Sequence, residues 1–117
     1  KINALPATQR LLEKIREQTK SSPYALLGMH YVLLGSKHGG KFIAKICQEK
    51  YQFSDGLGVC YFDPYGPNFM PIWKSFREEM NQHQFEPEEI ERICAAAATM
   101  FRAVTEIGDE LMPLVKA

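Results

Sequence analysis

Three glycines, Gly35, Gly39 and Gly40, lie close together in the middle of an otherwise apolar segment. A glycine inside a helix costs about 1 kcal/mol relative to alanine, and it leaves main chain bare on one side. A flat, rigid ligand could approach that bare backbone within van der Waals distance. The alternative is that the glycines let another segment pack closely, or mark a break between two helices. From spacing alone we favour packing, because ligand sites of this kind are rarer than packing contacts.

Other residues that carry chemistry in proteins have simpler interpretations in this chain. His30 lies on an apolar segment and is interpreted as a core histidine, whereas His83 lies in a polar turn and is expected to be exposed. Cys47 and Cys94 fall on helical patterns and are interpreted as core residues. The sequence contains no Ser-His-Asp arrangement, phosphate-binding loop or dinucleotide fingerprint.

The elements around the glycines are predicted to be helices. The spacing of apolar residues predicts a first helix over residues 6–19 and a second from about Pro23 to residue 34. The second helix is apolar nearly all round, which predicts a buried central element. After the glycines it resumes over residues 41–50, so the whole is expected to form one kinked helix. Its second part carries three apolar positions: Phe42, Ile43 and Ile46.

The second half of the chain supplies two more predicted helices after a loop. Residues 51–70 are rich in glycine and proline and predict an irregular loop, with room for a short extended piece at 59–62. A third helix begins near Pro71. Glutamates at residues 86–91 suit the start of a fourth helix, whereas a di-iron site would need Glu-x-x-His pairs on facing helices. The apolar stripe predicted for this helix is Ile90, Ile93, Ala97, Phe101, Val104, Ile107 and Leu111.

Composition places the chain among all-α globular proteins and excludes several functional classes. The length of 117 residues allows one domain, spanning residues 1–117, and 45% of the residues are hydrophobic. Fourteen basic and fourteen acidic residues balance, which argues against nucleic acid as a partner. No apolar run is long enough to span a membrane, and three dispersed cysteines favour a reducing, cytoplasmic location. Because the chain begins at Lys1 without a methionine, we expect the natural protein to be longer.

The segment from Tyr31 to Gly40 resembles the distal-helix motif of the bacterial, biliverdin-producing heme oxygenases, which reads YVLEGSxLGG. Later segments follow in the order of that family: residues 62–66 resemble its aromatic-glycine loop, residues 73–77 its WxxF segment, and residues 90–111 its long final helix. The resemblance covers nearly the whole chain but only about the C-terminal half of a family member. It implies part of a heme oxygenase-like helical bundle of about four helices, with the glycine-kinked helix at its centre.

The resemblance implies that this chain supplies the distal wall of a heme site. Gly35, Gly39 and Gly40 match the motif directly, and Ser36 stands where the mammalian branch has a catalytic aspartate. With Tyr31 these residues are the predicted distal pocket. Arg77 stands where the family places a basic residue toward the heme propionates, and a guanidinium matches a carboxylate fork. Arg77 could equally be a solvated surface residue, and Lys74 is a weaker candidate for the same task.

The activity implied is oxidative cleavage of heme to biliverdin, carbon monoxide and iron, with heme as substrate and an electron donor such as a ferredoxin or a flavin reductase. His38 departs from the family pattern: facing the iron, it could be an axial ligand that blocks oxygen, or its ring could point away and hydrogen-bond in solvent. The family's proximal histidine helix has no match, and heme iron needs an axial ligand. The chain alone is therefore expected to be inactive and, with its core face uncovered, to self-associate. The alternative function is a non-catalytic heme-binding or interaction module.

Overall fold

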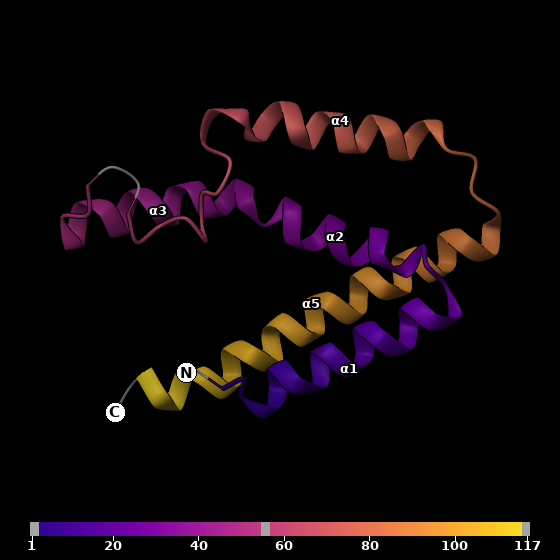
Figure 1. Ribbon diagram of the computed structural model, residues 1–117, viewed down its shortest axis with the longest axis horizontal. Helices are drawn as coiled ribbons and strands as arrows, with labels where there is room; N and C mark the ends of the chain where they lie inside the picture. The colour runs from indigo at the N-terminus through magenta and orange to yellow at the C-terminus, as the bar shows by residue number, and fades with distance from the viewer. Residues whose placement is uncertain (1–2, 55–56, 116–117) are drawn as a thin grey trace. The chain divides into compact units, whose positions relative to one another are not determined.

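The computed structural model describes residues 3–54 and 57–115, and it is built from helices (Figure 1). The helices are α1 (Pro6–Ser21), α2 (Ala25–Gly35), α3 (Lys37–Tyr51), α4 (Phe69–Gln82) and α5 (Pro87–Val115), with a 3-10 turn, η1 (Gly66–Asn68), before α4. No strand occurs within these described ranges, which confirms the predicted all-α class. None of the helices in the described ranges is long and apolar enough to cross a bilayer.

The predicted central helix is present as two helices, α2 and α3, separated at Ser36. Ser36 keeps right-handed helical angles, φ −60° and ψ −20°, and its carbonyl accepts a hydrogen bond of 3.1 Å from the Gly40 amide. The chain therefore passes from α2 into α3 at Ser36 without leaving helical conformation, and we call this junction the bend. The extended piece predicted at residues 59–62 is wrong. The amides of Phe62 and Asp63 both donate to the Val59 carbonyl, at 3.0 and 3.1 Å, which makes a helical type of turn.

The chain forms two compact units, with the boundary inside α2 between Val32 and Leu33 and a second boundary between Gln84 and Phe85. The first unit contains α1, most of α2 and α5, and Figure 1 shows α1 and α5 running side by side. Its core is built largely from small and flexible residues: Ala25, Met29, Val32, Ala96 and Met100, with Leu11, Ile15 and Ala97 packed against them.

The burial predicted for α2 and α5 is partly wrong. Leu26, Tyr31 and Leu33 are exposed, so α2 buries one face and not its whole circumference. On α5, Ile93 is buried as predicted, but the other buried positions are Ala96, Met100 and Ala103. Phe101 is 60% exposed and Val104 is 47% exposed. The small alanines allow close contact between helices, so the larger neighbours one position away lie outside the contact.

The second unit contains the end of α2, α3, the following loop and α4. Its most deeply buried side chain is Phe69, at 1% exposure, and Val59 and Ala44 are also buried. The three apolar positions of α3 are not buried: Phe42 is 72% exposed, Ile46 is 61% exposed and Ile43 is 45% exposed. The face of α3 that is buried carries Gly40 and Ala44 instead. Helical periodicity correctly identifies the apolar stripe of α3, but the loop after α3 packs on a different face, at Gly40.

Candidate functional site

The three glycines at the bend have three different surroundings. A Cβ atom added to Gly40 would overlap the Phe62 carbonyl oxygen, so this glycine admits the loop, which is the packing alternative. A Cβ atom at Gly35 would lie 3.4 Å from the Trp73 ring. At Gly39 no atom lies within 4 Å of the added Cβ, so the main chain there is open. Of the three, Gly39 is the position where a flat ligand could reach the backbone.

The Ser36 side chain is hydrogen-bonded to the main chain of the preceding helical turn. Its hydroxyl donates a hydrogen bond of 2.6 Å to the Leu33 carbonyl oxygen. Because a hydroxyl has one hydrogen and two lone pairs, Ser36 can still accept a hydrogen bond but has no hydrogen left to donate in this arrangement. Among the described residues, no group of three or more histidine, cysteine or acidic side chains could hold a metal ion.

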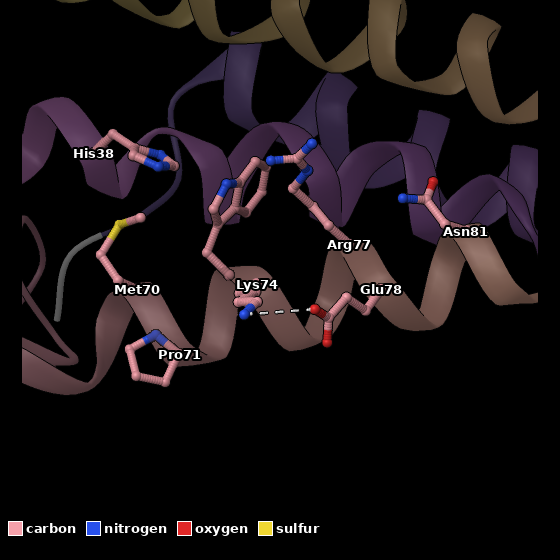
Figure 2. Close-up of a pocket in the computed structure, with 8 residues that line it drawn as sticks. His38, Met70, Pro71, Lys74, Arg77, Glu78 and Asn81 are labelled. Atoms are coloured by element: carbon pink, nitrogen blue, oxygen red, sulfur yellow. Dashed lines mark ion pairs between the residues drawn. The ribbon is translucent and has the colours of Figure 1, made fainter.

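A groove of about 840 Å3 lies beside the bend (Figure 2). Apart from His38, its lining residues come from α4: Met70, Pro71, Trp73, Lys74, Arg77, Glu78 and Asn81. Figure 2 shows Met70, Arg77 and Asn81 rising from α4 on the side where His38 lies. The groove therefore combines an aromatic and thioether surface with cationic and amide groups.

The His38 ring is held in the groove by one hydrogen bond and two aromatic contacts. Its Nδ1 atom lies 2.9 Å from the Gly35 carbonyl oxygen. Because a carbonyl only accepts, Nδ1 must carry the hydrogen, which leaves the Nε2 lone pair available in the neutral ring. The ring meets Phe69 and Trp73 edge to face, with centroid distances of 4.7 and 5.1 Å. The His38 side chain is thus exposed, but its ring orientation is fixed by these contacts. The sequence suggested a ring that faces iron or one that hydrogen-bonds in solvent, and neither interpretation included a bond to the Gly35 carbonyl.

The charges on α4 are not equivalent. Lys74 pairs with Glu78 at 3.8 Å, and both side chains are largely exposed, so each partly neutralises the other. Arg77 makes no ion pair within the described ranges, so its guanidinium is available to a carboxylate at the groove. Tyr31, one turn before Gly35 on α2, is not among the groove-lining residues. The structure thus brings together His38, Arg77 and the Gly35 backbone.

Sequence reasoning missed part of this site. Positions 39, 42, 43 and 46 share one face of α3, so the open Gly39 backbone continues into the exposed side chains of Phe42, Ile43 and Ile46. The spacing was visible in the sequence but was assigned to the core. Met70, Pro71 and Asn81 had no recognisable signal, because they line the groove only where α4 lies near His38. None of the positions 39, 42, 43 and 46 is among the residues that line the groove.

Comparison of the sequence with known proteins identifies a family. The sequence model of the heme oxygenase family, described as "Heme oxygenase", matches residues 1–110. The chain is also 29% identical over 114 residues to "Heme oxygenase 1" of Bos taurus, a match that covers 93% of this chain and 39% of the bovine protein. No solved structure matches the chain. With a family match along nearly its whole length, this chain belongs to the heme oxygenase family.

Proposed function

We propose that the protein cleaves heme oxidatively to biliverdin, carbon monoxide and iron, and that this chain supplies the distal wall of the heme site. The observation that carries the proposal is the open main chain at Gly39, beside exposed apolar side chains on one face of α3. The family match supports the class of ligand. Because the chain spans only 39% of its bovine relative, the axial ligand and the rest of the pocket are proposed to come from further protein.

Each residue at the bend would then have a limited task. Gly39 lets the porphyrin plane lie against backbone, and Phe42, Ile43 and Ile46 extend an apolar surface along the same face. Arg77 holds a propionate through paired N–H donors. Ser36 accepts a hydrogen bond from water near the bend, since its own hydrogen is bound to Leu33. Bound heme would supply the iron at which oxygen is reduced.

The test is an optical titration of the full-length natural protein with hemin, followed by addition of a reductant in air. We expect a sharp Soret band that forms at one equivalent of hemin and then bleaches as biliverdin absorption appears. Absence of a saturable Soret band would contradict the proposed heme site. A stable Soret band that never bleaches with an efficient donor would contradict turnover but leave heme binding in place.

A second function, heme binding without turnover, is favoured by one observation. The hydrogen bond from His38 Nδ1 to the Gly35 carbonyl orients the ring and leaves Nε2 free to ligate iron. If His38 closes the sixth position, the ferric spectrum is low-spin, and His38→Ala converts it to a five-coordinate, high-spin spectrum. An identical spectrum in His38→Ala would rule out His38 as an iron ligand.

The partners and location follow as parts of the same proposal. We propose a cytoplasmic protein of bacterial type that receives electrons from a ferredoxin or a flavin reductase. We also propose that the 117-residue chain self-associates, because large apolar side chains such as Phe101, Phe42 and Ile46 are exposed. Sedimentation velocity should show a dimer or larger species at tens of micromolar chain, and a sharp monomer peak there would contradict self-association.

A further inference from the structure

A hydrogen bond to Gly66 ties the turn before α4 to α3. Gly66 has a left-handed conformation, with φ +53°, and it begins the 3-10 turn that runs directly into α4. Its amide donates to Asp63 Oδ1 at 3.2 Å, and its carbonyl accepts a hydrogen bond from Lys41 Nζ. Both backbone groups of Gly66 are therefore bound by side chains, one of which comes from α3.

Lys41 is the residue through which α3 holds this turn. Its ammonium group lies 3.9 Å from the Asp63 carboxylate and 5.9 Å from the Phe69 ring centroid. The side chain is only 36% exposed, so its hydrogen bond to the Gly66 carbonyl is partly shielded from water. The long ion pair contributes less than this hydrogen bond, since partly solvated pairs at such distances are weak.

The contacts continue from this turn into the groove. Phe69, the first residue of α4, is buried and meets the His38 ring edge to face at 4.7 Å. Trp73, one turn later on α4, also meets the His38 ring edge to face, with a centroid distance of 5.1 Å, and it lies against Gly35. A displacement of the Gly66 turn would therefore move Phe69 and Trp73 together, because both stand on the first two turns of one rigid helix.

We propose that Lys41 is a positioning residue for the groove. By holding the Gly66 carbonyl, it sets where α4 begins and keeps Phe69 and Trp73 against the His38 ring. Lys37 lies one turn before Lys41 on α3 and contacts the same loop, where it donates a hydrogen bond of 2.8 Å to the Tyr61 carbonyl. This contact is not with the turn that leads into α4. Lys41 contacts no ligand in this account and acts only through α4. The part of the proposal that concerns heme rests on the proposed function; the part that concerns Trp73 does not.

Trp73 is the single tryptophan of the chain, so its fluorescence reports the groove without any ligand. The test compares Lys41→Met, which keeps the aliphatic stem, with Lys41→Arg, which restores a cationic donor. Lys45→Met is the matched control, because Lys45 lies one turn further on α3, is exposed and makes no hydrogen bond or ion pair within the described ranges. Far-ultraviolet circular dichroism establishes that each variant is helical.

In Lys41→Met we expect a red shift of Trp73 emission and a two- to threefold larger acrylamide quenching constant. Lys41→Arg should recover most of both signals, and Lys45→Met should match the parent chain. Parent-like emission and quenching in a helical Lys41→Met would overturn the proposal, and so would an equal change in Lys45→Met. Should Lys41→Met unfold, Lys41→Gln keeps a shorter donor and must shift the emission in the same direction.

A hemin titration of the same variants separates this proposal from the proposed function. If both hold, Lys41→Met weakens hemin binding three- to tenfold and Lys41→Arg restores it. If the parent protein fails to bind hemin, the proposed function fails while the Trp73 comparison still decides the role of Lys41. If hemin binds the parent and Lys41→Met equally although Trp73 has moved, the groove is not part of the heme site, and the ligand arm of the proposal is overturned.

Discussion

Gly28 in the first unit and Gly39 in the second are glycines for opposite reasons. In the first unit, a Cβ atom at Gly28 would overlap the Ile93 carbonyl oxygen and crowd the Ala97 amide, so Gly28 exists to let α2 lie directly on α5. In the second unit, Gly39 has nothing within 4 Å of its missing side chain. The same residue type therefore marks a helix contact at Gly28 and a bare surface at Gly39. Each unit also contains the other kind, an open glycine at Gly108 in the first and a packed one at Gly40 in the second. Only the surroundings distinguish a packing glycine from one available to a ligand.

The units also differ in how they hold their helices together. The first unit relies on alanines and methionines in close helix contacts. It also has a hydrogen bond between helix ends, in which the Ala7 amide donates to the Glu110 carboxylate at 3.0 Å. The second unit has one large buried ring, Phe69, and fixes its loop by lysine hydrogen bonds to backbone carbonyls. Both units leave large apolar side chains exposed, among them Phe101 in the first unit and Phe42 and Ile46 in the second.

The largest expected effect is on the second unit, from removing its buried ring. Phe69→Ala should reduce the free energy of unfolding by about 4 kcal/mol, because the lost transfer energy adds to an unfilled cavity. Urea denaturation followed by Trp73 fluorescence measures this directly. A loss below about 1 kcal/mol would mean that Phe69 is not the central support of this unit.

The next effect tests the packing role of glycine in the first unit. Gly28→Ala should destabilise the chain by about 2–3 kcal/mol, since the added methyl group meets backbone that cannot rotate away. Urea denaturation followed by circular dichroism gives the value. Unchanged stability would show that α2 does not lie on α5 as described.

A smaller loss of stability is expected when the contact between the first turn of α1 and Glu110 of α5 is weakened. Glu110→Gln keeps an acceptor for the Ala7 amide but removes the negative charge from the N-terminal end of α1. The loss should be about 0.5–1 kcal/mol, in the range of charge interactions with a helix terminus. Thermal denaturation at low and high salt measures it, and the difference from the parent chain should shrink at high salt. A difference that grows with salt would contradict an electrostatic origin.

The smallest effect has the opposite sign. Gly39→Ala and Gly108→Ala place a methyl group in open space on a helix, so each should stabilise the chain by about 0.5–1 kcal/mol. Gly40→Ala, next to Gly39, should instead destabilise it because the loop carbonyl of Phe62 is in the way. Chemical denaturation of the three variants side by side checks this. Equal effects at positions 39 and 40 would erase the distinction between an open and a packed glycine.

The helices were largely predictable from the sequence, because apolar spacing, prolines and acidic starts act locally. Which side of a helix is covered was not. The stripe at Phe42, Ile43 and Ile46 has the periodicity of a core face, and periodicity cannot tell protein from an absent ligand or partner. On α5 the buried face includes the alanines Ala96 and Ala103. The prediction placed this face at the larger residues Phe101 and Val104, which are exposed.

The roles of individual site residues divide in the same way. The glycines stood out through their spacing, and Arg77 through the resemblance to the heme oxygenase family. The Lys41 contact with Gly66 joins residues 25 positions apart and could not be seen before the loop was placed on α3. The orientation of His38 likewise depends on Phe69 and Trp73, which arrive from another helix.

The most direct test of the heme site is hemin quenching of Trp73 fluorescence in Gly39→Leu, with Gly108→Leu as the matched control. Both leucines enter open space on a helix, but only the one at position 39 would occupy the surface proposed for the porphyrin. We predict at least a tenfold rise in the hemin dissociation constant for Gly39→Leu, equivalent to about 1.4 kcal/mol, and parent-like binding for Gly108→Leu. Equal hemin affinity in the two variants would contradict a macrocycle resting on the backbone at Gly39.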